Sequence, residues 1–132
     1  EIYKRIREID SRVNYENLQD ELIDRFGEYP DVVAYLLEIG LVKSYLDQAF
    51  VALAERKQES VTIRFEKISQ QIYLTQDYFE ALSATNIKAR IGEQQGLIEV
   101  VFDVRHKKDF EILENLLNFG EKLVEIKNRK AE

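Results

Sequence analysis

The sequence predicts an α+β domain with three N-terminal helices, a small mostly antiparallel sheet interrupted by one helix, and a long C-terminal helix packed on the sheet. Apolar residues recur at three- and four-residue steps up to about residue 47, which is the period of a helix with one buried face. The period then changes to the alternation that is typical of half-buried strands. Helical spacing returns after residue 107, and this order indicates helices and strands that are segregated along the chain.

Three helices are predicted before the sheet. The first covers residues 1–9 and the second about residues 15–26, with a break between them in which Asp10, Ser11 and Asn14 are candidate N-caps. Gly27 can adopt the left-handed conformation that closes a helix. The third helix therefore begins at Pro30 or the residue after it, because proline suits the first turn of a helix.

In the middle of the chain, the residue pattern predicts strands on either side of one helix. Residues 50–54 form a short strand, and residues 61–65 form a half-buried strand in which Val, Ile and Phe alternate with Thr and Arg. Residues 68–74 form a weaker strand. Thr75 is a candidate N-cap for a helix that ends near residue 86.

A hairpin and a long helix complete the predicted fold. Residues 87–91 pair with residues 97–103 across a loop with glycine at both of its ends, Gly92 and Gly96. The apolar residues of the second strand should point into the core. The last helix covers residues 107–127, where two apolar stripes run side by side.

Composition limits the class of protein. The chain has 132 residues, a formal net charge of −6, no cysteine and no methionine. It has no apolar run near the ~20 residues that a membrane span needs, so we expect a cytoplasmic protein without a membrane partner. A chain without methionine that opens inside a helix is expected to be a fragment. We expect one regulatory domain over residues 1–132, with residues 1–12 as a remnant of the linker that precedes it.

Motifs for catalysis are missing from the sequence. The single histidine, His106, cannot serve a set of metal ligands or a catalytic triad by itself. Neither a phosphate-binding loop nor a dinucleotide-binding glycine motif is present. We therefore predict no catalytic residue, no cofactor and no metal site for this chain.

The run from Glu21 to Gly27 is the most informative motif. Glu21 and Asp24 are three residues apart, so a helix places both carboxylates on one side. Arg25 and Phe26 follow directly. This run, followed by Pro30 and preceded by Tyr-Lys-Arg-Ile at residues 3–6, resembles the signature of the C-terminal (TRCF) domain of bacterial transcription-repair coupling factors, the Mfd family. The resemblance covers about the first third of the chain.

The resemblance implies a function. In that family an ATP-driven DNA translocase pushes stalled RNA polymerase and then recruits the excision-repair protein UvrA. Its C-terminal domain has no motor motifs and is thought to clasp the UvrB-like N-terminal module of the same protein, so that it masks the UvrA-binding surface and competes indirectly with UvrA. Glu21, Asp24, Arg25 and Phe26 are then the candidate partner-binding residues. Phe26 also completes an apolar stripe with Leu22, and we assign its side chain to the core.

Two alternatives remain at this point. One is a free-standing small-molecule or enzyme domain with an acidic cleft, which would need a deep pocket lined by carboxylates. The other is an RNA polymerase or nucleic-acid contact through Lys107 and Lys108. The net negative charge argues against a dedicated nucleic-acid binder, so we expect direct nucleic-acid binding to be unlikely.

Overall fold

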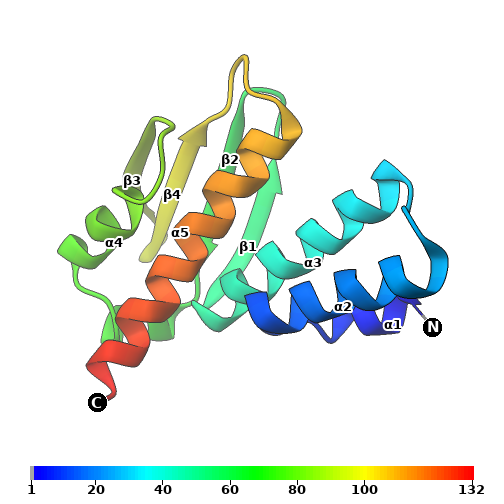
Figure 1. The fold of residues 1–132 in the computed structure, drawn as a ribbon. Helices are drawn as coiled ribbons and strands as arrows, with labels where there is room; N and C mark the ends of the chain where they lie inside the picture. Colours follow the sequence, from blue (N-terminus) through cyan, green and yellow to red (C-terminus); the bar gives the residue numbers. More distant parts are fainter. Residues whose placement is uncertain (1) are drawn as a thin grey trace. The chain divides into compact units, whose positions relative to one another are not determined.

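The computed structural model describes residues 2–132, and Glu1 lies outside the described residues. The chain divides into two compact units, Glu1–Tyr45 and Leu46–Glu132. The prediction that the whole chain acts as one regulatory domain stays a prediction. The predicted α+β class is confirmed, with helices first, then a four-stranded sheet, then a long C-terminal helix (Figure 1).

The first unit consists of the three predicted helices. They are α1 (Ile2–Arg7), α2 (Arg12–Phe26) and α3 (Asp31–Gln48), whose last residues belong to the second unit. Ser11 is the N-cap of α2, and its hydroxyl oxygen accepts a hydrogen bond from the Asn14 amide at 3.1 Å. The cap lets α2 begin three residues earlier than predicted, because it satisfies an amide that the first helical turn leaves unpaired.

Two glycines shape this unit. Gly27 has a φ of 72° and closes α2, and its amide donates a hydrogen bond to the Ile23 carbonyl at 2.8 Å. Gly40 lies under α1, where a Cβ atom would be 2.9 Å from Ile6 Cγ2. The missing side chain therefore lets α1 and α3 approach closely. The core of the unit is formed by apolar side chains of all three helices and of the α1–α2 connection, namely Ile6, Ile9, Leu18, Leu22, Leu37 and Leu41.

The second unit contains an antiparallel sheet. Its strands are β1 (Val51–Arg56), β2 (Ser60–Phe65), β3 (Ala89–Gln94) and β4 (Leu97–Asp103), in the spatial order β1-β2-β4-β3. The alternation in β2 is confirmed, since every second residue from the second position onward is buried. This arrangement places β2 and β4 in the middle of the sheet and leaves β1 and β3 at its edges.

The predicted hairpin is confirmed, with β3 paired to β4 and Ile91 opposite Val100. Val100 and Phe102 are fully buried, so the predicted register is correct. The turn is shorter than predicted. Gln95 and Gly96 both have positive φ values, 53° and 80°, as in the two-residue turns that connect strands most tightly.

The strand predicted over residues 68–74 is wrong. Lys67–Gln71 form a 3-10 helix, η1. Ser69 is fully buried, and its hydroxyl lies 3.4 Å from the Tyr78 hydroxyl, which donates to it. Leu74 is 58% exposed and occupies the N-cap position of α4 (Thr75–Leu82), where we expected Thr75. The Asp77 carboxylate caps this helix by accepting the Leu74 amide at 2.7 Å.

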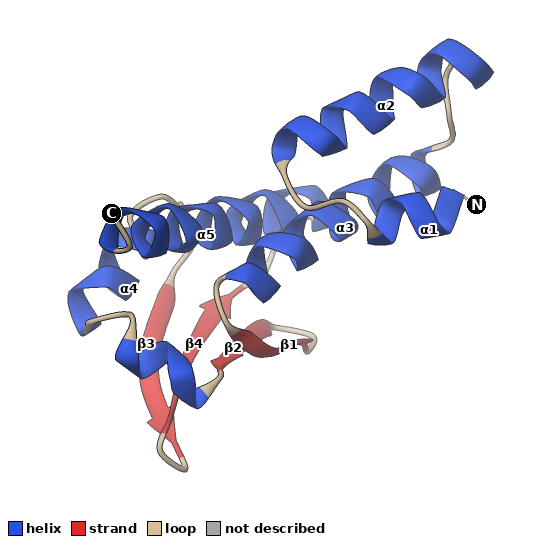
Figure 2. Cartoon of the chain, turned by 90° about the horizontal axis from the view of Figure 1, so that it is seen from below, coloured by secondary structure: helices blue, strands red, loops and turns tan. Residues whose placement is uncertain are grey.

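The C-terminal helix α5 (Asp109–Lys130) packs on the sheet, as predicted. Figures 1 and 2 show α5 running across one face of the four strands, with α4 beside it. Phe119 is the centre of this contact, with ring centroids 5.2 Å from Phe102 and 6.3 Å from Phe65 in edge-to-face geometry. No described helix is both long enough and apolar enough to cross a bilayer.

Candidate partner-binding surface

The predicted partner-binding residues lie on the C-terminal half of α2. Leu18 and Leu22 point into the core of the first unit, with 3% and 6% of their surfaces exposed. Residues on the other sides of the helix therefore face outward. We define the α2 surface as Glu21, Asp24, Arg25 and Phe26.

Glu21 is the half-buried member of the α2 surface. Its carboxylate forms an ion pair with the Arg5 guanidinium on α1, and both side chains are 40% exposed. The pair joins α1 to α2. Because exposed ion pairs contribute only about 0–1 kcal/mol to stability, an arginine of a partner could replace Arg5 at little cost.

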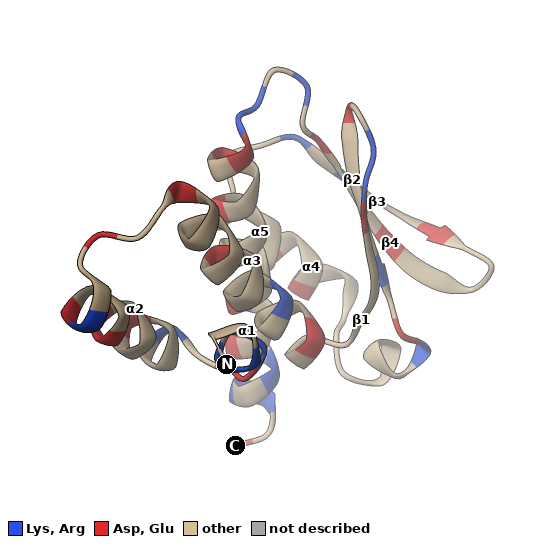
Figure 3. Ribbon diagram, turned by 90° about the vertical axis from the view of Figure 1, so that its right-hand side faces the viewer, with Lys and Arg blue, Asp and Glu red and all other residues tan. Residues whose placement is uncertain are grey.

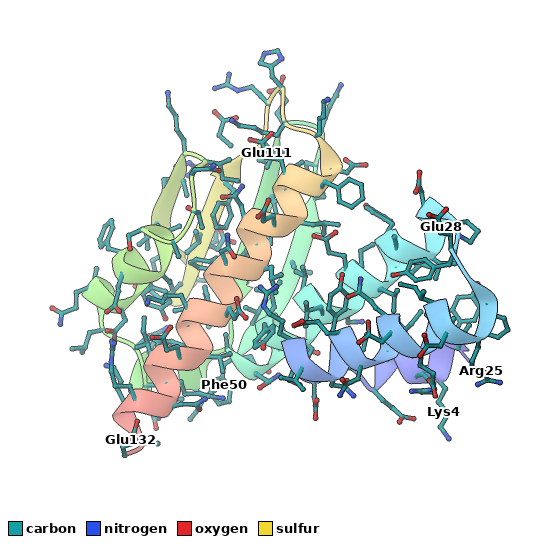
Figure 4. The ribbon with its side chains drawn as sticks, viewed as in Figure 1. Lys4, Arg25, Glu28, Phe50, Glu111 and Glu132 are labelled. Atoms are coloured by element: carbon teal, nitrogen blue, oxygen red, sulfur yellow. The ribbon has the colours of Figure 1, made fainter. Side chains whose placement is uncertain are left out.

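Asp24 and Arg25 are both exposed. Within residues 2–132 no side-chain hydrogen bond or ion pair involves the Asp24 carboxylate. Figure 4 shows Arg25 at the C-terminal end of α2. Its guanidinium carbon lies 5.4 Å from the centroid of the Phe26 ring, within the range of a cation–π contact.

The assignment of Phe26 to the core is wrong, because 68% of its surface is exposed. Phe26 is four residues after the buried Leu22, but it is the last residue of α2. The chain turns away at Gly27, so no other element of this unit covers the ring. Ile23 is also half exposed, at 50%. An exposed aromatic ring in contact with a guanidinium is typical of the anchors of protein interfaces.

The unit that carries the α2 surface is acidic. The first unit contains six Lys and Arg residues against ten Asp and Glu residues, a net charge of −4. Most of the excess negative charge of the chain is therefore in the unit that carries the α2 surface. A basic partner surface would complement it.

Two concavities of the described residues differ from the acidic cleft that an enzyme reading would need. Two shallow concavities of about 420 and 360 Å³ adjoin at one end of the sheet and share Lys88, Asp103 and Arg105 as lining residues. Cations outnumber carboxylates around both. Among residues 2–132 no group of three His, Cys, Asp or Glu side chains could hold a metal ion.

The carboxylates near His106 are already paired. Asp103 forms a two-pronged ion pair with Arg105, with Arg105 Nη2 at 2.7 Å from Oδ2. The hydrogen bonds from Arg105 lower the pKa of Asp103 to about 2. Asp109 pairs with Arg56 at 2.7 Å. His106 is therefore an exposed loop residue between two ion-paired carboxylates.

The sequence does not reveal the contacts of three charged residues, because their neighbours are far away in the chain. Arg5 is part of the motif that carried the family resemblance, but no spacing rule connects it to Glu21, which is 16 residues away. The sequence places Lys88 and Arg90 in a predicted hairpin strand and gives no sign of a basic cluster. Their approach to Arg105 depends on the pairing of β3 with β4.

Comparisons with known proteins agree on one family. Residues 1–78 match the family model of the TRCF domain. Transcription-repair-coupling factor of Bacillus subtilis is 26% identical over 129 residues, which are 98% of this chain and 11% of that protein. The homologous protein of Staphylococcus epidermidis is 27% identical over 128 residues. The chain thus spans about a tenth of the length of these curated relatives.

A solved structure is similar over nearly the whole chain. It is described as the crystal structure of the C-terminal domain of transcription-repair coupling factor. The match has a TM-score of 0.95 and 70% sequence identity, and it covers 98% of this chain and 80% of that chain. The fold described above is therefore the fold of that domain.

Proposed function

The chain belongs to the TRCF domain family, and on that premise we propose that it is a regulatory interaction module of a transcription-repair coupling factor. The module binds a second surface of the same protein reversibly and thereby controls access to it. Its biological context is transcription-coupled nucleotide excision repair. The curated relatives named transcription-repair-coupling factor are about nine times as long as the chain. The catalytic parts therefore belong to the rest of the parent protein.

The observation that carries the proposal is the exposed α2 surface. It combines an unpaired carboxylate, a guanidinium and an aromatic ring that its own unit does not cover. A surface of this kind offers an apolar anchor together with charge-assisted hydrogen bonds, which orient a partner. The partner should be basic, because the unit that presents the surface is acidic.

We propose that the partner is the UvrB-like N-terminal module of the same protein. The clasp masks the UvrA-binding surface until the protein engages stalled polymerase, and it therefore competes indirectly with UvrA. Tethering within one chain raises the effective concentration of the two surfaces, so a modest interface is sufficient and remains releasable. The module itself performs no catalysis, and the parent is an ATP-dependent DNA translocase of the bacterial cytoplasm.

The test is a binding measurement with a double variant, Glu21→Ala with Asp24→Ala. Both carboxylates are at the surface, so the fold should be nearly unchanged. Binding to the UvrB-like module, measured by calorimetry, should weaken by roughly 2 kcal/mol or more because two charge-assisted contacts are lost. Binding of the unmodified chain should also weaken with added salt. In the full-length parent, the double variant should bind UvrA without a lesion or polymerase.

The matched control removes two carboxylates from the other unit, Glu93→Ala with Glu114→Ala, both of which are exposed. It changes the net charge equally and should leave binding within experimental error. If both double variants bind as tightly as the original chain, the clasp lies elsewhere. If both weaken binding equally, the interaction depends on total charge and the α2 surface has no specific role.

A further inference from the structure

One end of the sheet gathers positively charged side chains from two separate segments. Lys88 directly precedes β3 and Arg90 is the second residue of that strand, while Arg105, His106 and Lys107 belong to the loop between β4 and α5. We call these five residues the basic end. In Figure 3 the ribbon of this loop carries Lys and Arg positions, coloured blue, next to the first turn of α5.

Backbone contacts hold the two segments together. The Asp103 amide donates to the Lys88 carbonyl at 2.8 Å, which extends the β3–β4 ladder by one step. The Lys107 amide then donates to the Val104 carbonyl at 3.1 Å, and His106 has a φ of 63°. The loop is therefore a tight turn, and both concavities at this end are lined by residues of both segments.

Two of the three acidic neighbours of the basic end, Asp103 and Glu111, are paired, whereas the third, Glu59, is exposed and lines the concavity of about 420 Å³. Asp103 is held by Arg105 through two hydrogen bonds of 3.0 and 2.7 Å to its two oxygens. Lys107 pairs with Glu111 at 3.6 Å. Lys88 and Arg90 are exposed, and no ion pair involves either of them in the described part of the chain. Two positive charges thus remain available on the same side of an edge strand.

Edge strands often carry charged residues simply to prevent aggregation. Lys88 and Arg90 differ from that ordinary case because they lie at a concavity that Arg105, from another segment, also lines. None of the exposed large apolar side chains lines either concavity. A protein partner would lack an apolar anchor there, whereas a phosphate backbone needs only cations and hydrogen-bond donors.

We propose that the basic end binds the phosphate backbone of double-stranded nucleic acid without reading its sequence. No aromatic side chain is exposed there to stack on unpaired bases, which favours a duplex over a single strand. The net charge of the chain does not prevent this contact. Charges farther away than the Debye length, about 8 Å at physiological salt, are largely screened, so the local charge of the surface decides.

The test uses the 132-residue chain and a fluorescently labelled duplex of about two helical turns at low salt, read by anisotropy. The variant Lys88→Gln with Arg90→Gln should bind at least tenfold more weakly. Each phosphate contact contributes about 0.9 to the slope of log affinity against log salt, so the slope should fall by about 2. The control, Lys43→Gln with Lys67→Gln, removes two other exposed cations and should change binding less than twofold.

Three results would overturn the proposal. The first is no binding of the duplex by the original chain at 50 mM salt. The second is an equal loss in both double variants, which would indicate attraction to total positive charge. The third is displacement of the duplex by an acidic peptide of matched charge at matched concentration, which would identify an acidic protein as the partner. The substituted residues all lie outside the α2 surface. A failure of this duplex-binding test would therefore not affect the proposed clasp.

Discussion

Arg5 on α1 donates a hydrogen bond to the Glu21 carboxylate on α2, so one of the two candidate clasp carboxylates already has a partner inside its own unit. The two carboxylates are therefore not equivalent. The Asp24 carboxylate is free to accept a hydrogen bond from a partner protein. The Glu21 carboxylate must first release Arg5 before a donor of the partner can take its place. Through this ion pair, α1 lies next to the α2 surface.

Replacement of Arg5 by alanine should strengthen the clasp. The loss of a 40% exposed ion pair should lower the free energy of unfolding by less than about 1 kcal/mol. Glu21 would then be free, and binding to the UvrB-like module should become several-fold tighter in calorimetry. Arg7→Ala, on the same helix and exposed, is the matched control. Weaker binding by Arg5→Ala would show instead that Arg5 itself contacts the partner.

Gly40→Ala should loosen α1. Alanine normally favours a helix by up to about 1 kcal/mol over glycine, but here its Cβ would lie 2.9 Å from Ile6 Cγ2 and 3.1 Å from the Ile6 carbonyl oxygen. We expect a net loss of roughly 1–2 kcal/mol in unfolding experiments and faster amide exchange in α1. Gly92→Ala, with nothing within 4 Å of the added Cβ, should show no comparable loss.

Phe119→Ala should be among the most damaging single substitutions. The side chain is fully buried between the rings of Phe65 and Phe102. The cavity left behind should cost about 3–5 kcal/mol of unfolding free energy, measured by denaturant titration. Phe110→Ala, on the same helix but 58% exposed, should cost much less. Equal losses from the two substitutions would mean that α5 does not pack on the sheet through Phe119.

Asp77 should stabilise the α4–α5 contact in its charged form. Burial alone would raise its pKa, but hydrogen bonds from Lys130, at 2.6 Å, and from the Leu74 amide lower it overall. The stabilisation is therefore present above the ordinary pKa of aspartate and is lost as the pH falls below it. Asp77→Ala should lower stability by about 2 kcal/mol at neutral pH, since a cap and a charged hydrogen bond are lost. At low pH the difference from the original chain should shrink.

Asp103 should titrate with a pKa of about 2, because Arg105 hydrogen-bonds to both of its oxygens. The contribution of this pair to stability is complete above the ordinary aspartate pKa of about 3.9 and disappears as the pH falls toward 2. Carboxyl carbon shifts in NMR would follow the titration directly. Arg105→Gln should return the midpoint to near the ordinary value. An unchanged midpoint in that variant would contradict the ion pair.

The sequence by itself determined most of the elements that depend on near neighbours in the chain, with the exception of the 3-10 helix η1, where it predicted a strand. The helical periods, the break before α2 with Ser11 among its candidate caps, and the end of α2 at Gly27 follow from contacts within four residues. The β3–β4 hairpin is equally local, because a short turn decides its register. The motif from Glu21 to Gly27 identified the family for the same reason, since its residues are contiguous.

The tertiary structure decided everything that depends on residues far apart in the chain. Leu22 and Phe26 share a helical stripe, yet only Leu22 meets another helix, so spacing alone could not place Phe26 at the surface. The partner of Glu21 is 16 residues away, and the concavity shared by Lys88 and Arg105 exists only once β3 has paired with β4. Spacing rules describe one element at a time, whereas exposure and ion pairing are set by how elements pack together.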